Sequence, residues 1–174
     1  YGPDKMLWVT ERMGKRIVRV NPENGNKKVA VTIDEAFAAG GQQGVLGMAM
    51  EQNFMRSGSS NYLYVLYTYK PTLNSPEHGY KKLVRYQYDA SEQELKNPVT
   101  VLDKLPAGDD HNGGRMVFGP DGMLYISFGE HGHNQNANYT LPIEAQRLQT
   151  APEIAMGNYD ASVGKVLRVS TDAV

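Results

Sequence analysis

The chain has 174 residues, of which 40% are hydrophobic and 21% are charged, and its formal net charge is −1. This composition is ordinary for a folded globular protein, and the lack of a basic region or a run of like charges argues against a nucleic-acid-binding surface. No apolar stretch reaches the roughly 20 residues that a membrane-spanning helix requires. Cysteine is absent, which excludes disulfide bonds and thiolate chemistry but leaves the cellular compartment open. Because the chain begins at Tyr1, with neither a signal peptide nor an initiator methionine, we expect its N-terminus to have been trimmed.

The first part of the chain contains three segments with the pattern of β-strands. Two of them lie in GPDKMLWVTERMGKRIVRVNPENG, residues 2–25, and the third is KKVAVTI, residues 27–33. Apolar and polar residues alternate, β-branched and aromatic types are frequent, and Gly, Pro and Asn separate the segments. The pattern predicts antiparallel hairpins within residues 1–34.

The middle part repeats this pattern in four segments. Residues 45–50 (VLGMAM), 62–69, 81–89 and 99–105 (VTVLDKL) are patterned in the same way and are joined by short connections. Strands that follow one another closely in sequence usually pair with one another. We therefore predict that these four segments form one four-stranded antiparallel sheet.

The last part begins in the same way and is then interrupted. GRMVFGP, residues 114–120, and GPDGMLYISFGEHG, residues 119–132, predict two strands. GKVLRVSTDA, residues 164–173, predicts a third strand after an insertion of residues 133–163.

A short helix is expected within this insertion. In TAPEIAMG, residues 150–157, Thr150 is suited to be the N-cap, Glu153 completes a capping box and Gly157 is suited to the C-terminal end. The insertion could pack over the neighbouring strands or form a wall of a cleft.

The three parts are copies of one unit. Each has a leucine followed by an aromatic residue in one strand and an arginine at a corresponding place in the next: Leu7, Trp8 and Arg19; Leu63, Tyr64 and Arg85; Leu124, Tyr125 and Arg168. We expect the arginine stems to cover aromatic surface on the strand faces. A repeated four-stranded unit is typical of a propeller blade, so we predict an all-β fold: a β-propeller fragment of about three four-stranded antiparallel blades.

The units are not equally complete. Residues 45–105 contain all four strands of a blade, residues 1–34 lack the innermost strand, and residues 111–174 lack the outermost one. Because blades bury their faces against one another, we expect this chain to be part of a longer protein. Its end faces would then be covered by the remainder of the propeller or by self-association.

Two loops lead into innermost strands and are expected at one mouth of the propeller channel. GGQQG, residues 40–44, contains Gln42, and GDDH, residues 108–111, contains His111 at the equivalent place in the next unit. Glu130 follows the next strand of the same hairpin and is expected within reach of His111. A histidine paired with a carboxylate is suited to act as a general base, because the carboxylate fixes the tautomer and stabilises the imidazolium.

His131 and His133 alternate in the loop after the second of these strands. Such spacing can bind a metal ion, but a metal site needs three or four converging ligands, so we predict no metal site here. We expect His131 on a surface loop and His133 in the lining of a cleft.

The segments GQQGVLGMAM, LPAGDDHNGGRMVFGPDGMLYISFGEHGHNQ and MGNYDASVGKVLRV resemble the soluble pyrroloquinoline quinone (PQQ) dependent glucose dehydrogenases of the glucose/sorbosone dehydrogenase family. The resemblance implies a six-bladed propeller, in the periplasm or secreted, that binds PQQ and calcium above the channel and oxidises aldoses to lactones. In that family most PQQ and calcium ligands lie in segments that this chain does not contain. The chain alone is therefore expected to be inactive.

The resemblance also implies roles for single residues. His111 matches the base that takes the proton of the anomeric hydroxyl, and Glu130 matches an aspartate that supports it. Gln42 and Asp110 match positions that hold the substrate, Gln135 lies in the same pocket segment, and His111 and Gln42 would also contact the cofactor. The family has aspartate at the position of Glu130 and arginine at that of His133, so carboxylate reach and local charge differ here.

Two other functions are compatible with the repeats. A noncatalytic propeller could bind protein partners along its rim, although this would not explain the equivalent positions of Gln42 and His111. A sugar-lactone hydrolase propeller would need several metal-binding carboxylates and asparagines that converge in the channel.

Overall fold

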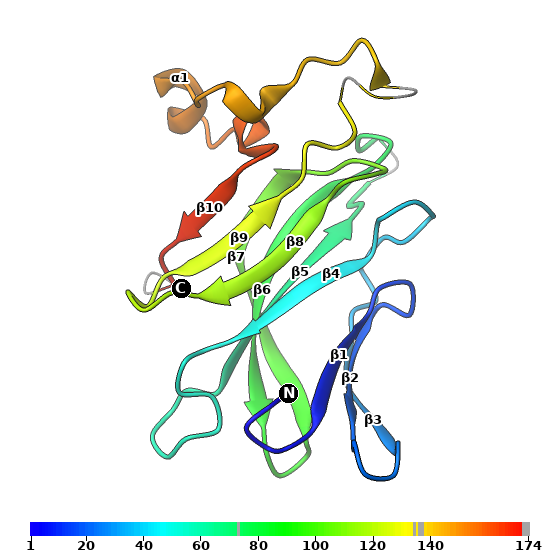
Figure 1. The fold of residues 1–174 in the computed structure, drawn as a ribbon, viewed down its shortest axis with the longest axis vertical. Coiled ribbons are helices and arrows are strands. Elements are labelled where there is room, and N and C mark those ends of the chain that lie inside the picture. Colours follow the sequence, from blue (N-terminus) through cyan, green and yellow to red (C-terminus); the bar gives the residue numbers. More distant parts are fainter. Residues whose placement is uncertain (73, 134, 136–137, 172–174) are drawn as a thin grey trace.

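The computed structural model describes residues 1–72, 74–133, 135 and 138–171. Their strands form three antiparallel sheets that follow one another in chain order (Figure 1). The first sheet contains β1 (Leu7–Glu11), β2 (Arg16–Val20) and β3 (Lys27–Thr32); the second contains β4 (Val45–Met50), β5 (Tyr62–Tyr69), β6 (Tyr80–Asp89) and β7 (Glu94–Pro106); the third contains β8 (Gly113–Phe118), β9 (Leu124–Phe128) and β10 (Val166–Val169). The prediction of an all-β fold is confirmed.

The second sheet has the order β4-β5-β6-β7, so the predicted four-stranded sheet is confirmed. β7 differs from its expected range because it begins at Glu94 rather than at residue 99. The pairing of β7 with β6 shifts register near Asn97, which has a φ of 52°. Pro98 follows directly, and it is tolerated because β7 is an edge strand whose outer side needs no amide donor. Because the pairing is irregular here, the start of β7 does not show the alternation of apolar and polar residues that predicts a strand.

The arginines of the repeat stand in one register. In each sheet the arginine pairs across the strands with the aromatic residue: Trp8 with Arg19, Tyr64 with Arg85, and Tyr125 with Arg168. Two of these arginines lie against aromatic rings, as predicted: the guanidinium carbon of Arg19 is 5.3 Å from the centre of the Trp8 ring, and that of Arg85 is 4.1 Å from the Tyr62 ring.

An aspartate completes this arrangement in the first and third sheets. Asp4 accepts hydrogen bonds from Nε1 of Trp8 (3.1 Å) and Nη2 of Arg19 (2.6 Å). Asp121 accepts them from the hydroxyl of Tyr125 (2.8 Å) and Nε of Arg168 (3.0 Å). Both aspartates come from the Gly-Pro-Asp turns. The turn motif therefore supplies a carboxylate to the strand pair that follows it. We call each set of three residues, Asp4, Trp8 and Arg19 or Asp121, Tyr125 and Arg168, an Asp–aromatic–Arg triad.

β5 is buried on both faces. Leu63, Val65 and Tyr67 pack into a core shared with the first sheet, while Leu66 packs into a second core shared with the third sheet. Successive side chains of a strand point to opposite faces, so one strand can serve both cores. This is the packing expected for the middle blade of three.

The innermost strands of the second and third sheets, β4 and β8, approach each other at glycines. A Cβ atom on Gly47 would lie 2.1 Å from the carbonyl oxygen of Gly114. A side chain at this point would have to push two strands apart.

The variant Gly47→Ala is therefore expected to lower the free energy of unfolding by about 1–3 kcal/mol, as overpacking typically does. Chemical denaturation would measure this loss. Val117→Ala, on the exposed face of β8, is the control and should stay within about 0.5 kcal/mol of the unmodified chain. Equal stability of the Gly47 variant would contradict the close packing of the two strands.

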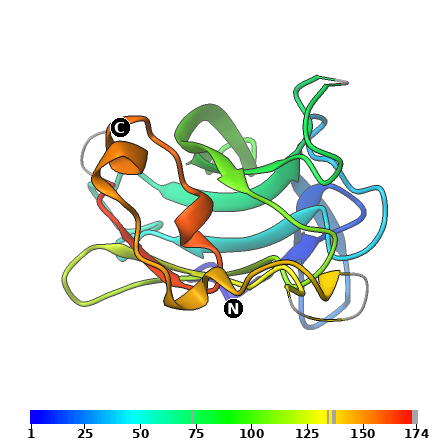
Figure 2. The same ribbon diagram turned by 90° about the horizontal axis from the view of Figure 1, so that it is seen from above.

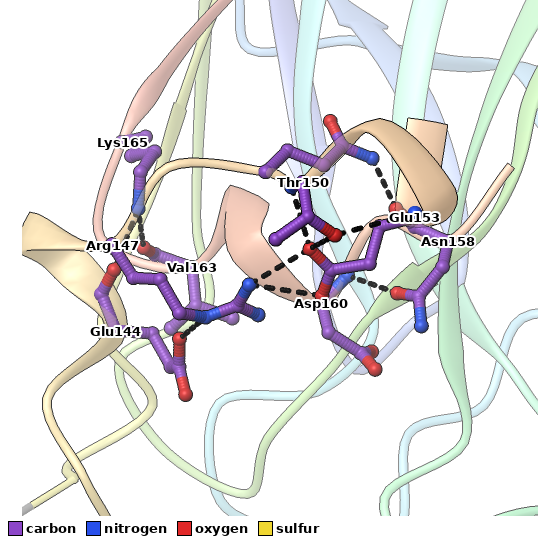
Figure 3. A network of polar contacts seen from close by, with 9 residues as sticks. Glu144, Arg147, Thr150, Glu153, Asn158, Asp160, Val163 and Lys165 are labelled. Carbon is purple, nitrogen blue, oxygen red and sulfur yellow. Dashed lines mark hydrogen bonds and ion pairs between the residues drawn. The ribbon is translucent and has the colours of Figure 1, made fainter. Parts of the chain in front are cut away.

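Over its described residues, the insertion includes the short helical segments η2 (Glu144–Gln146), α1 (Ala151–Ala155) and η3 (Asp160–Ser162). It lies beyond one end of the third sheet (Figures 1 and 2). The predicted capping box between Thr150 and Glu153 is present at the start of α1. Arg147 joins the segments by contacting Glu144 and both carboxylate oxygens of Glu153, each at 2.9 Å (Figure 3). Among the described residues, no helix is both long and apolar enough to cross a membrane.

Candidate functional site

The two loops expected at the channel mouth lie side by side. The backbone N–H of Gln42 donates to the carbonyl of Asp109 at 2.7 Å. A Cβ atom on Gly41, whose φ is 45°, would lie 2.3 Å from that same carbonyl oxygen, so only glycine fits there. Arg12 supports the first loop by donating to the carbonyls of Gly41 (2.7 Å) and Gln43 (2.8 Å). The loops before β4 and β8 are thus joined into one surface.

His111 and Glu130 are in direct contact on this surface, through Nδ1 of the imidazole and Oε1 of the carboxylate. Oδ2 of Asp110 lies 3.5 Å from Nε2 of His111. The side chain of His111 is 37% exposed. A carboxylate on Nδ1 selects the tautomer in which Nδ1 donates its proton, which leaves the lone pair of Nε2 free to accept another.

His111 and Glu130 each stabilise the charged form of the other. The hydrogen bond to Glu130 and the charge of Glu130 raise the pKa of His111, and the charge of Asp110 acts in the same direction. The hydrogen bond from His111 lowers the pKa of Glu130 despite partial burial, which acts in the opposite direction. Glu130 is therefore ionised at neutral pH, and it favours proton uptake by His111.

The backbone at His111 is held in an unusual conformation. Its φ is 45°, in the left-handed region that is uncommon for residues other than glycine. The buried Asn112 fixes this turn, because its side chain accepts from the N–H of Gly108 (3.0 Å) and donates to the carbonyl of Gly108 (2.7 Å). Sequence reasoning missed Asn112, since an asparagine before two glycines is also common in exposed turns.

His131 is the clearest correction to the sequence analysis. It was expected on a surface loop, but it is only 5% exposed and its Nε2 lies 3.1 Å from Nζ of Lys81. Burial and the charge of Lys81 lower its pKa to about 3. The loop after β9 folds back over β6, and no local pattern in the loop itself signals that contact. His133 is half-buried, with Nδ1 2.9 Å from the carbonyl of Pro142.

The other candidate residues are less closely associated with His111. The side chain of Gln42 is exposed and free of hydrogen bonds to described residues, although its backbone joins the two loops. Gln135 is exposed in the turn after Gly132, and no hydrogen bond to described residues links its side chain to His111. Over the described residues there is no group of three or more His, Asp or Glu side chains placed to hold a metal ion.

Comparison with known proteins gives concordant matches. The Glucose / Sorbosone dehydrogenase family model matches residues 1–173. Quinoprotein glucose dehydrogenase B of Acinetobacter calcoaceticus is 38% identical over 175 residues, which cover 99% of this chain and 36% of that protein. The PQQ-bound form of aldose sugar dehydrogenase from Streptomyces coelicolor has a TM-score of 0.72 and 28% identity, over 98% of this chain and 43% of that one.

A more distant relative is human Hedgehog-interacting protein, which is 27% identical over 103 residues, covering 56% of this chain and 14% of that protein. The chain thus spans well under half the length of each of these relatives. The family match nonetheless extends over almost every residue of the chain and agrees with the three stacked sheets. The chain belongs to the glucose/sorbosone dehydrogenase family, and its sheets are blades of a β-propeller.

Proposed function

We propose that the protein containing this chain oxidises an aldose at the anomeric carbon to a lactone, with PQQ as the hydride acceptor. The observation that carries the proposal is the contact between His111 and Glu130 where two channel-mouth loops meet, in a member of a sugar dehydrogenase family. Removal of hydride from a carbon that bears a hydroxyl group requires a base for the hydroxyl proton, and this pair is suited to supply one.

The proposed chemistry of the pair follows from its geometry. Nε2 of His111 would accept the proton of the anomeric hydroxyl, while Nδ1 keeps its own proton and donates it in a hydrogen bond to Glu130. The developing imidazolium is then stabilised by two carboxylates, Glu130 on one nitrogen and Asp110 near the other. PQQ, when bound, supplies the two-electron acceptor for the hydride.

The residues present fit the reacting end of such a cofactor rather than its carboxylates. His111 and Gln42 offer a half-exposed imidazole and an exposed amide, which could contact a quinone oxygen or a sugar hydroxyl. Asp110 and Glu130 would repel the carboxylates of PQQ. We therefore propose that His111 and Gln42 contact the cofactor at its reacting face, and that its cationic ligands and calcium are held by segments outside this chain.

The substrate-binding residues are proposed from the family relationship. Gln42, Asp110 and Gln135 are proposed to hydrogen-bond the hydroxyl groups of the sugar. A location in the periplasm or outside the cell is proposed by the family relationship.

The direct test is reconstitution. The whole protein would be titrated with PQQ and calcium, and the oxidation of several aldoses would be followed with a dye as electron acceptor. Aldose-dependent dye reduction that requires PQQ is the expected result. No reduction with any aldose, despite measured PQQ binding, would contradict a sugar dehydrogenase.

The pH dependence provides a separate prediction. Because the pKa of His111 is raised, kcat/KM should increase as pH rises through that elevated value, where the imidazole becomes neutral. In Glu130→Gln the pKa of His111 should fall toward its ordinary value, which shifts the acid limb of the profile to lower pH. The plateau rate should fall by about 10- to 100-fold, because the imidazole is no longer fixed by a carboxylate.

The control for this profile is Glu77→Gln, which removes an exposed carboxylate in the loop between β5 and β6 and should leave the profile unchanged. An acid limb that stays in place in Glu130→Gln would show that His111 does not act through Glu130.

A noncatalytic propeller that binds protein partners is the second candidate function. The sequence similarity to Hedgehog-interacting protein supports this candidate. It predicts no PQQ binding by the whole protein. The reconstitution experiment therefore separates the two candidates.

A further inference from the structure

A lysine that has no carboxylate partner among the described residues is buried beneath the candidate site. Lys81, near the start of β6, is 0% exposed, and no ion pair links it to any described residue. Burial lowers its pKa to about 7. Burial of an ammonium group is unfavourable unless its donors are satisfied, so the contacts of Nζ need an explanation.

Among the described residues, Nζ of Lys81 contacts three groups, all in the segments that carry His111 and Glu130. It donates to the carbonyl of Asn112 at 3.0 Å and lies 3.1 Å from Nε2 of His131. It also lies 4.0 Å from the centre of the Phe128 ring. An ammonium group has three N–H donors, and these two acceptors and one aromatic face match that number.

The two acceptors stand directly beside the proposed base and its partner. Asn112 follows His111 in the chain, and His131 follows Glu130. Nζ of Lys81 thus links the backbone carbonyl of Asn112, next to His111, to the side chain of His131, next to Glu130. A methionine of similar length would fill the same space but could not donate to either acceptor.

We propose that Lys81 is a positioning residue for the His111–Glu130 pair: it ties the two segments together and thereby fixes the distance between imidazole and carboxylate. The inference rests on the proposed function in one respect, because it assigns the pair a role in the reaction. The link itself can be tested without turnover.

Lys82 offers a matched control on the same strand. Its Nζ pairs with Glu35 at 2.9 Å and lies 4.1 Å from the centre of the Tyr69 ring. Lys82 therefore has an ion pair and an aromatic contact, but neither Glu35 nor Tyr69 belongs to the segments that carry His111 and Glu130. Lys82→Met therefore makes the same chemical change at the neighbouring position.

The experiment is a titration of His111 by NMR in the whole protein with ring-labelled histidine, in which the missing signal of His111→Gln gives the assignment. The charged groups that face the His111 ring are Glu130 and Asp110. In Lys81→Met, loosening of the Glu130 contact should lower the pKa of His111 toward its ordinary value. Loss of a nearby positive charge alone would raise it, so the sign of the shift separates positioning from a charge effect.

The kinetic expectation is a kcat reduced by about 10²-fold, the scale of a misplaced catalytic group, with KM little changed. Lys82→Met should alter neither the titration nor kcat. A folded Lys81→Met protein with an unchanged or raised His111 pKa would overturn the proposal.

A second pair of variants covers the case in which Lys81→Met does not fold. His131→Leu removes the acceptor for Nζ from the other side, and His131→Gln restores one near the position of Nε2. The pKa of His111 should fall in the first and return in the second, and equal values in both would overturn the proposal. Normal turnover in His111→Gln would instead refute the base assignment while leaving the measured link intact.

Discussion

His111→Gln is expected to lower kcat by about 10²–10⁴-fold in the whole protein, the usual loss when a general base is removed. Glutamine approximates the size and hydrogen bonding of the imidazole but cannot accept a proton at neutral pH. Steady-state oxidation of an aldose with a dye acceptor would measure the loss.

Quinone binding should be nearly unaffected in this variant, because the carboxylate ligands of PQQ are proposed to lie outside this chain. A spectroscopic titration with PQQ measures this directly. His78→Gln is the control, since His78 lies in the loop between β5 and β6 and is not part of the pair. Near-normal turnover of the His111 variant would contradict the assignment of His111 as the general base.

Asp4→Ala is expected to cost about 3–5 kcal/mol of unfolding free energy, because it leaves the buried Arg19 guanidinium without its carboxylate partner. The neutral Gln93 side chain, which accepts from Nη1 of Arg19 at 3.0 Å, cannot neutralise that charge. The side chains of Asp4 and Arg19 are 14% and 7% exposed, and the same carboxylate also accepts from Trp8. Denaturant unfolding of the variant and the unmodified chain would measure the difference.

The repeat supplies the matched control for this variant. Asp121 and Arg168 form the equivalent pair in the third sheet, but their side chains are 36% and 57% exposed. Exposed ion pairs contribute about 0–1 kcal/mol, so Asp121→Ala should have a much smaller effect. Similar losses in the two variants would show that burial of the triad does not determine its contribution.

The repeat and the strand order could be predicted from the sequence because their signals are local. Alternation marks each strand, turn residues separate them, and the arginine register recurs in all three copies. The pairing of Glu130 with His111 could be anticipated for a related reason, since the two residues flank one hairpin of adjacent strands, β8 and β9.

The features that were missed depend on which distant segments meet. His131 is buried because β6, from another sheet, brings Lys81 beneath its loop, and nothing in the neighbouring residues signals that contact. Likewise, no local signal in the Gly-Pro-Asp turns predicts a role beyond the turn itself. Their aspartates act on strands through contacts with residues as far as 47 positions away, as between Asp121 and Arg168.

The two-faced burial of β5 has a consequence for how this chain unfolds. Its odd-numbered side chains, Leu63, Val65 and Tyr67, belong to one core, and Leu66 belongs to the other. If either core opens, one face of β5 is exposed to water and the strand loses half of its apolar contacts, which weakens its hold on the remaining core. The neighbouring blades are therefore coupled energetically through this one strand, and the three sheets should lose structure cooperatively rather than as independent units.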